Sequence, residues 1–349
     1  MKPLKIAIVG WAQSVHIQRW SQGLAKMGYQ VRVVSLGDGT IDGVETININ
    51  RSGRLSYLTQ KSNAVRAIRQ FEPDIVHAHY ATGNAWWGIK SGARPLVISV
   101  WGSDVISFPS NPITKAISSY LLSKADRICA TNQLLKERAV VLTNTASDKT
   151  VVIPFGVNVP DQMSPYPEAD QFRICFVKAL TKVYGPDLLI RAFAEALKTI
   201  PKMQLSLAGD GPMRGELERL SEQSGIADRV RFVGKIPYEQ VYPFIQAHHL
   251  MAMPSRSESF GVAVLEAGAC ARPVLATNVG GVPELLEHEK NGLLVPTENV
   301  TALADGITKL AQDRNLSQHL GRNGYRLVKE RFSWDESLAR MSALYQSLV

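Results

Sequence analysis

The chain has 349 residues, of which 45% are hydrophobic and 20% are charged, and its formal net charge at pH 7 is +8. This composition is ordinary for a soluble protein that buries real cores, and the length favours two domains because one domain holds roughly 100–200 residues. A membrane-spanning helix needs ~20 consecutive apolar residues, and no segment approaches this length, so we expect no membrane-spanning helix. The three cysteines lie far apart and fit neither a disulfide framework nor a metal site, so we expect reduced, buried thiols and a cytoplasmic protein.

The excess positive charge lies entirely in the first half of the chain. Residues 1–167 hold 18 Lys/Arg and 10 Asp/Glu, whereas the remainder holds 21 of each. A lobe with one sign of charge indicates an anionic partner, such as a membrane surface, a phosphorylated lipid or a nucleic acid. The alternative is an incidental excess of solubilising lysines.

Short apolar runs alternate with helical-period segments in the first half, a pattern typical of a parallel sheet covered by helices. The first run is too short for a secretory signal and reads as a strand. The expected strands are residues 5–9, 31–35, 75–77, 96–100 and 127–130. The expected helices are residues 17–27, 55–70 and 116–123. Prolines and a glycine in residues 154–168 can sustain neither a helix nor a central strand and predict a linker.

The same alternation restarts after the linker. The expected strands are residues 173–177, 204–208, 231–233, 250–253 and 274–276, and the expected helices are residues 187–198, 212–223, 238–246, 262–270 and 334–348. We therefore expect an α/β protein with two doubly wound parallel-sheet domains. Their predicted bounds are residues 1–167, joined by the C-terminal helix 333–349, and residues 168–332. Ligands of such sheets bind at the carboxyl ends of the strands, so functional residues are expected in strand-to-helix loops, in the crevice between the two domains.

The sharpest motif is Met-Pro-Ser-Arg-Ser-Glu-Ser-Phe-Gly-Val-Ala-Val-Leu-Glu-Ala-Gly at residues 253–268. A strand is expected to end near Pro254 and a helix to begin near Gly261. The unpartnered amides and partial positive charge of a helix start can hold a diphosphate. Two carboxylates, Glu258 in the loop and Glu266 in the helix, suit a substrate rich in hydroxyls. Alternatively, Glu258 only complements the helix dipole and Glu266 faces solvent.

This spacing, two glutamates seven residues apart with Ser-Phe-Gly between them, resembles the donor-site signature of family 4 glycosyltransferases of the GT-B fold. Further segments resemble the same family: residues 153–158, 209–212, 233–236, 273–277, 280–285 and 291–295. The resemblance implies two Rossmann-like domains facing across a cleft. It also implies a nucleoside-diphosphate sugar as co-substrate, no metal or other cofactor, and transfer that retains the anomeric configuration.

The resemblance also implies roles for individual residues. Glu258 would contact the transferred sugar as a catalytic residue, and Glu266 would bind the ribose hydroxyls. Ser259, Phe260 and Gly261 would line the donor diphosphate. Gly209 lies in the segment that resembles the family's turn after the second strand, and Gly234 and Lys235 lie in the segment that would frame the nucleotide base.

The sequence departs from the family where an Arg and a Lys usually clamp the diphosphate. Ala179 stands in the Arg position and Tyr184 in the Lys position. A departing diphosphate still needs positive charge. We therefore expect Lys178 to be the catalytic cation and Lys182 to be a second donor-binding cation, although either lysine could be plain surface charge.

The acceptor side is expected in the first domain. Trp-Gly-Ser-Asp at residues 101–104 replaces the family's His-Gly-x-Asp and resembles polysaccharide-building members, so Trp101 would line the site and Asp104 would accept from a substrate hydroxyl as a catalytic residue. The Trp101 indole can only donate a hydrogen bond. His79 is a candidate acceptor contact, and Gly10 with Trp11 looks like a shortened form of the family's glycine loop. No third or fourth ligand is spaced near His79 for a metal.

Basic residues accompany the helix expected at residues 55–70, namely Arg51, Arg54, Lys61, Arg66 and Arg69. Its apolar members, Leu55, Leu58, Val65 and Ile68, would suit an amphipathic helix lying on an anionic membrane, or one packed on its own sheet. We expect a peripheral protein at the inner face of the membrane that extends a lipid-linked or cell-surface glycan in polysaccharide biosynthesis. Two alternatives stay open: a nucleotide-sugar epimerase on the same fold and a basic, non-catalytic nucleic-acid-binding protein. No nucleic-acid-binding module is recognisable, so no nucleic-acid partner is expected.

Overall fold

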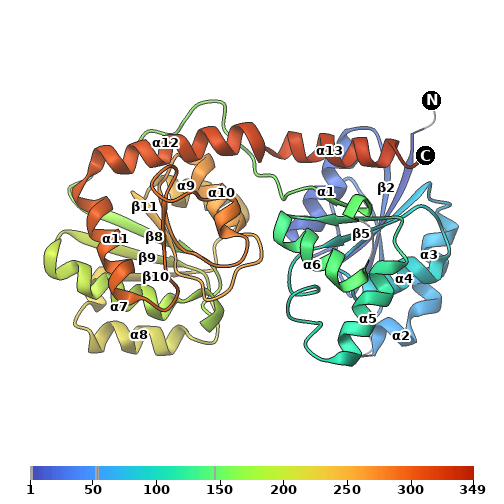
Figure 1. Cartoon of the computed structure of the whole chain (residues 1–349), viewed down its shortest axis with the longest axis horizontal. Coiled ribbons are helices and arrows are strands. Elements are labelled where there is room, and N and C mark those ends of the chain that lie inside the picture. Colours follow the sequence, from blue (N-terminus) through green and yellow to red (C-terminus); the bar gives the residue numbers. More distant parts are fainter. Residues whose placement is uncertain (1–2, 52, 54, 145–146) are drawn as a thin grey trace. The chain divides into compact units, whose positions relative to one another are not determined.

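The computed structural model describes residues 3–51, 53, 55–144 and 147–349. The chain forms two compact units, and the expected fold class is confirmed (Figure 1). Unit 1 comprises Met1–Phe155 and Asp335–Val349, and unit 2 comprises Gly156–Trp334.

Unit 1 is built on a wholly parallel sheet in the order β3-β2-β1-β4-β5-β6-β7. The strand order reverses between β1 and β4, which is where ligands bind in doubly wound folds. The central strands are buried along their length because helices cover both faces, so their sequences are almost continuously apolar. The strands are β1 (Lys5–Val9), β2 (Gln30–Leu36), β3 (Glu45–Ile49), β4 (Ile75–His79), β5 (Leu96–Val100), β6 (Arg127–Ala130) and β7 (Thr150–Val152).

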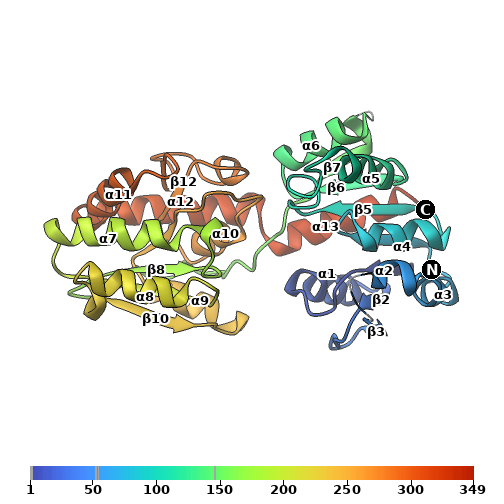
Figure 2. The same ribbon diagram turned by 90° about the horizontal axis from the view of Figure 1, so that it is seen from below.

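The helices of unit 1 lie in two layers (Figures 1 and 2). One face of the sheet carries α1 (Val15–Lys26) and α13 (Trp334–Gln346). The other face carries α3 (Lys61–Gln70), α4 (Gly83–Ser91), α5 (Pro112–Ser123) and α6 (Gln133–Thr143), with the short α2 (Ser56–Thr59) packed on α3 and α4 and the 3-10 turn η1 (Ser147–Lys149) before β7. The C-terminal helix α13 is tied to the core of unit 1, because the Tyr345 hydroxyl lies 2.6 Å from His77 Nδ1.

Unit 2 repeats the plan with a parallel sheet in the order β10-β9-β8-β11-β12-β13, and its strand order reverses between β8 and β11. Helices α7, α8 and α11 cover one face, and α9, α10 and α12 cover the other (Figure 1). The strands are β8 (Phe172–Val177), β9 (Met203–Ala208), β10 (Val230–Gly234), β11 (Leu250–Met253), β12 (Val274–Thr277) and β13 (Leu293–Val295). The α-helices are α7 (Pro186–Thr199), α8 (Arg214–Gln223), α9 (Tyr238–Gln246), α10 (Val262–Ala269), α11 (Val300–Gln312) and α12 (Arg314–Arg331). The 3-10 turns are η2 (Lys182–Tyr184), η3 (Ala227–Arg229) and η4 (Val282–Glu284).

The proline-containing segment belongs to unit 2, so the first boundary falls at Phe155 instead of residue 167. Arg272, only 1% exposed, ties this segment to unit 2. Its guanidinium donates hydrogen bonds to the carbonyls of Ser164 and Pro165 in the segment and to the carbonyl of Gln246 at the end of α9. The Tyr325 hydroxyl adds a hydrogen bond to the Pro160 carbonyl. The segment therefore packs on unit 2 through backbone carbonyls that the sequence does not reveal.

The helix expected at residues 55–70 is interrupted at Gln60, which separates α2 from α3. The apolar side of α3 faces its own sheet, with Ala64, Ala67 and Ile68 buried. The prediction that this side lies on a membrane is therefore wrong for α3, while Leu55 and Leu58 on α2 are exposed. Arg54 lies outside the described residues.

Candidate functional site

Lys178 and Glu258, which are far apart in the sequence, form an ion pair at the carboxyl edge of the unit 2 sheet. Lys178 directly follows β8, and Glu258 lies in the loop after β11. These two strands are neighbours at the point where the strand order reverses, so their loops meet. The Lys178 Nζ lies 2.7 Å from Glu258 Oε2, and the two side chains are only 17% and 8% exposed. The structure thus brings together two of the three residues expected to be catalytic.

The Lys178 ammonium has an aromatic neighbour as well as an acidic one. Its Nζ lies 4.7 Å from the centroid of the Tyr184 ring, a cation–π distance. Tyr184 occupies the position where the resembling family carries a Lys. The Tyr184 ring and the Glu258 carboxylate together hold the Lys178 ammonium at the carboxyl edge of the sheet.

The expected helix start is present next to this pair. Gly261 precedes α10 with φ +95°, a conformation that favours glycine, and α10 has no acidic residue in its first turn. The first amides of a helix lack i−4 acceptors and carry partial positive charge, and in this turn the Val264 amide donates to the Gly261 carbonyl at 2.9 Å. Of the residues expected to line a diphosphate, Ser259 is half-buried and Phe260 is buried. Glu266 lies within α10 and is 8% exposed, so it does not simply face solvent.

Two glycines allow the neighbouring loops to close on the Lys178–Glu258 pair. A Cβ at Gly209, which directly follows β9, would lie 1.9 Å from the Lys178 carbonyl oxygen. A Cβ at Gly280, in the loop after β12, would lie 1.7 Å from the Glu258 carbonyl oxygen, and the Gly281 amide donates to that same oxygen. Both glycines have positive φ. Their lack of a side chain is therefore a steric requirement of the site.

Arg256 is a structural residue of the site that the sequence did not reveal. Its guanidinium makes two hydrogen bonds to the Asp187 carboxylate, 2.7 and 2.8 Å long, and donates to the Lys182 carbonyl. It also pairs with Glu298. Burial alone would raise the pKa of Asp187, but the Arg256 hydrogen bonds and charge bring that pKa below its ordinary value. Arg256 thereby fixes the loop after β11 against the start of α7, which holds Glu258 in place.

The other expected donor-binding residues lie along the same edge but make different contacts. The Lys182 side chain is exposed, and its charge helps to lower the pKa of Asp187. Gly234, with φ +80°, ends β10, and its carbonyl accepts from the Gly209 amide at 2.8 Å. Lys235 follows it and is exposed. Gly209 and Gly234 are thus brought together, whereas Lys182 and Lys235 remain surface cations of the same edge.

Unit 1 has a cavity of about 610 Å³ at the carboxyl ends of β1 and β2, which Trp11 lines and Gly10 does not. Trp11 is 46% exposed, and its indole donates to the Tyr57 hydroxyl at 2.8 Å. Burial raises the pKa of Tyr57 to about 12, against the opposing effects of the Trp11 hydrogen bond and the nearby charge of Arg51. The cavity is lined by Trp11, Ala12, Gln13, Ser14, Ser35, Leu36, Gly37, Asp38, Arg51 and Tyr57.

The prediction that Asp104 accepts from a substrate hydroxyl is wrong in this structure. Asp104 has no exposed surface, and its carboxylate accepts from the backbone amides of Ala81, Trp101 and Gly102 at 2.8–3.0 Å. Burial raises its pKa, although these hydrogen bonds counteract the shift. Asp104 is therefore a positioning residue that ties the turn after β5 to the turn after β4. The half-buried Trp101 stays a candidate lining residue.

His79 is also deeper than expected. It is 1% exposed and stacks on His77 with ring centroids 4.0 Å apart. Burial lowers its pKa well below the usual value, so the ring is neutral near pH 7. The edge-to-face contact with Trp101, 5.5 Å between centroids, makes His79 a support for that indole and not a surface contact for an acceptor.

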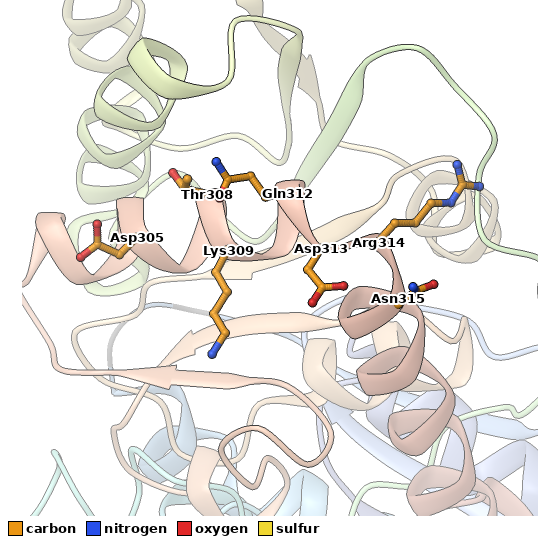
Figure 3. A pocket seen from close by; sticks show the side chains of 7 residues that line it. All are labelled: Asp305, Thr308, Lys309, Gln312, Asp313, Arg314 and Asn315. Atoms are coloured by element: carbon orange, nitrogen blue, oxygen red, sulfur yellow. The ribbon is translucent and has the colours of Figure 1, made fainter.

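A hollow elsewhere in unit 2, along α11 and the start of α12, has a different character. Thr308 and Gln312 point to one side of α11, and Lys309 and Asp313 point to the other (Figure 3). Asp313 caps α12, and Lys309 pairs with Glu289. These side chains have structural partners and do not converge on one point.

Within residues 3–51, 53, 55–144 and 147–349, no group of three or more His, Cys, Asp or Glu side chains could hold a metal ion. No helix there has the length and apolarity needed to cross a bilayer. Cys129, Cys175 and Cys270 are free and buried, and burial raises their pKa values.

Comparisons with known proteins agree with this arrangement. Residues 160–327 match the family model described as glycosyl transferases group 1, and residues 5–132 match the one described as glycosyl transferase 4-like. An uncharacterised glycosyltransferase of Methanocaldococcus jannaschii is 26% identical over 95% of both chains. A D-inositol 3-phosphate glycosyltransferase of Corynebacterium urealyticum is 27% identical over 99% of this chain and 93% of its own. The solved structure of Anabaena HepE, in complex with UDP and glucose, has a TM-score of 0.84 at 21% identity and covers 99% of this chain and all of its own.

The two family models together span most of both units. The carboxyl edge of unit 2 carries the helix start that the sequence motif predicted, beside the Lys178–Glu258 ion pair. Residues 5–132 and 160–327 thus resemble glycosyltransferase domains of these two families, and the chain has the two-domain GT-B fold.

Proposed function

We propose that the protein is a retaining glycosyltransferase that moves a sugar from a nucleoside-diphosphate sugar to a hydroxyl of an acceptor. The observation that carries the proposal is the buried Lys178–Glu258 pair beside the start of α10. One cation, one carboxylate and a row of helix amides meet the needs of a diphosphate that carries a polar sugar. Glu258 would accept hydrogen bonds from the sugar hydroxyls, and Glu266, deeper in α10, would bind the ribose.

The chemistry assigned to Lys178 follows from the charge that develops in the reaction. The bond between the anomeric carbon and the diphosphate oxygen breaks, the acceptor oxygen bonds to that carbon on the same face, and the proton of the acceptor hydroxyl passes to the departing diphosphate. Negative charge grows on the leaving diphosphate and positive charge on the sugar. Preorganised donors around the developing charge are typically the largest single source of rate acceleration. Lys178 and the α10 amides would stabilise the diphosphate, and the Glu258 carboxylate would stabilise the sugar, without a metal ion.

The known proteins suggest which substrates to test first. HepE binds UDP and glucose, so a uridine diphosphate sugar is the first donor to test. Two relatives are named for small anionic acceptors, D-inositol 3-phosphate and L-malate. The unit 1 cavity has one cation, Arg51, and one carboxylate, Asp38, in its lining beside the exposed indole of Trp11, which suits a sugar-like acceptor with hydroxyls and a negative group that Arg51 pairs. We propose that acceptors bind in this cavity, with a lipid-linked or cell-surface glycan intermediate as the acceptor class.

A donor screen tests the proposal. Purified protein is heated with a panel of uridine, guanosine and adenosine diphosphate sugars, with the free diphosphates and with oligonucleotides. The proposal expects one nucleotide-sugar class to raise the melting temperature and oligonucleotides to have no effect. Transfer is then followed by NMR of the product with the best donor, and retention of the anomeric configuration is expected. An inverted product, or a donor that is consumed at the same rate without any acceptor, would contradict a retaining transferase.

Consumption of the donor without any acceptor would indicate the alternative on the same fold, a nucleotide-sugar epimerase. An epimerase changes the sugar within the donor and needs no acceptor. Product analysis in the absence of acceptor separates the two activities. Stabilisation by oligonucleotides alone would instead favour the basic nucleic-acid-binding alternative.

A further inference from the structure

Unit 1 exposes apolar side chains on α5 and α2 that no described element covers. On α5, Ile113, Ile117 and Tyr120 are 73%, 43% and 44% exposed. They follow one another at intervals of four and three residues, so they lie on one side of the helix. Leu55 and Leu58 at α2 are 66% and 59% exposed. Helices α2 and α5 both pack against α4, on the face of the sheet opposite α1 and α13 (Figures 1 and 2).

A cavity between α3 and α4, in the same helix layer, is lined by cations. Its volume is about 470 Å³, and no acidic side chain is among its lining residues, which are Lys61, Ser62, Val65, Arg66, Arg69, Gln70 and Lys90. Arg69 is fixed by a 2.7 Å hydrogen bond from its Nε to the Ser91 carbonyl. The Lys90 ammonium lies 4.2 Å from the centroid of the Trp86 ring. Two of the four cations are thus held in place by the fold.

Four of the five α-helices described in this layer together have charge of a single sign. Helices α2, α3, α4 and α5 carry no Asp or Glu, and they carry the cations Lys61, Arg66, Arg69, Lys90 and Lys115. The fifth, α6, has mixed charge, with one Glu among two cations, and α8 of unit 2 carries three Glu and two Arg. A solubilising surface mixes both signs, so four neighbouring helices with only positive charge indicate an anionic partner.

We propose that the surface formed by α2, α3, α4 and α5, here called the basic face, docks on an anionic phospholipid membrane. Exposed apolar side chains beside cations are the combination that binds peripheral helices to the bilayer interface. Ile113, Ile117 and Leu55 enter the boundary between headgroups and acyl chains. The cations of the cavity between α3 and α4 contact lipid phosphates. This assignment rests on the lipid-linked acceptor class of the proposed function. It does not use the apolar side of α3, which is buried.

Vesicle co-sedimentation of the full chain tests the basic face. Two vesicle compositions are compared, pure phosphatidylcholine and phosphatidylcholine with 30% phosphatidylglycerol (about one anionic lipid in three). We expect binding to the anionic vesicles only, weakened by salt. Ile113→Glu should reduce the partition coefficient by about ten-fold or more. Removing cavity cations in Lys61→Gln/Arg66→Gln should reduce it by about five-fold per cation.

Matched controls keep the result specific. Met27→Glu changes a side chain that is 46% exposed at the end of α1, on the opposite face, and Lys202→Gln removes an exposed cation of unit 2; both should bind as the wild type does. Equal binding to both vesicle types, or equal losses in Ile113→Glu and Met27→Glu, would overturn the proposal. The proposal would also be overturned if the protein did not bind vesicles but formed a concentration-dependent dimer that the Ile113→Glu substitution dissociates. A second copy of the chain would then cover the basic face. The assay contains no donor, and nucleotide-induced thermal shifts of each variant are measured separately, so a failed docking surface and a failed donor site give different results.

Discussion

Replacement of Lys178 by Met separates the structural role of the ion pair from its role in transfer. The substitution keeps the apolar stem and removes the charge 2.7 Å from Glu258. At an effective dielectric constant of 20, the direct attraction at this distance is about 6 kcal/mol, much of which offsets the cost of desolvation. The side chains are 17% and 8% exposed, so the pair is closer to a buried pair, whose disruption costs about 3–5 kcal/mol, than to a surface pair. We expect Lys178→Met to lower the free energy of unfolding by about 2–4 kcal/mol.

The activity of the same variant should fall further than its stability explains. Loss of one preorganised group that faces developing charge costs about 10²–10³ in rate, so kcat/KM should fall by that factor under conditions where the variant is fully folded. The assay is urea unfolding followed by initial rates with the best donor. Glu258→Gln completes a double-mutant cycle, in which the double variant should be more stable than the sum of the single losses allows. Lys309→Met, which breaks an exposed pair with Glu289, is the control and should leave the free energy of unfolding close to that of the wild type. If Lys178→Met matched this control in both stability and rate, the reasoning would be refuted.

Further predictions concern the packing and titration of unit 2. Gly280→Ala should destabilise the protein by about 2 kcal/mol or more and weaken donor binding, because its Cβ would meet the Glu258 carbonyl oxygen at 1.7 Å and its φ is positive. Gly215→Ala, at the second residue of α8 where a Cβ would meet no atom within 4 Å, should be neutral or stabilising in the same thermal melts. Arg272→Met should cost about 3–5 kcal/mol in urea unfolding, since several carbonyls lose their buried donor; a loss below about 1 kcal/mol would contradict the role given to this residue. Burial lowers the pKa values of His248 and His249 to about 4, so between pH 6.5 and pH 4 the unfolded chain binds more protons than the folded one. The free energy of unfolding should therefore fall as the pH drops through this range, by up to about 1.4 kcal/mol per pH unit for each histidine. Unfolding curves that coincide at pH 6.5 and 5 would contradict this.

Much of the fold could be predicted from the sequence because the central strands are nearly continuous apolar runs. The strands Lys5–Val9, Leu96–Val100 and Leu250–Met253 were predicted with the bounds that the structure gives. The edge strand Glu45–Ile49 was missed because its alternating polar residues look like a loop. The three-residue strands β7 and β13 carry too few residues for any periodicity.

The candidate site was predictable where local chemistry defines it and not where tertiary contacts do. The helix start at Gly261 has a local signal, a glycine between small polar residues and an apolar run. The pairing of Lys178 with Glu258 needed the adjacency of β8 and β11, although both residues were named from the sequence. Asp104 was expected to contact substrate through the family resemblance and His79 through its position after a strand. The structure buries both, because the turns after β4 and β5 pack on each other. The bracing role of Arg256 depends on Asp187 and Glu298, which no spacing connects to it.

The donor site at the start of α10 is the centre of the account, and a crystal structure of the protein with bound UDP tests it most directly. The account predicts that diphosphate oxygens lie within hydrogen-bond distance of the first backbone amides of α10 and of Lys178 Nζ, with the ribose hydroxyls near Glu266. A nucleotide bound elsewhere, with those amides and Lys178 unchanged in their contacts, would contradict it.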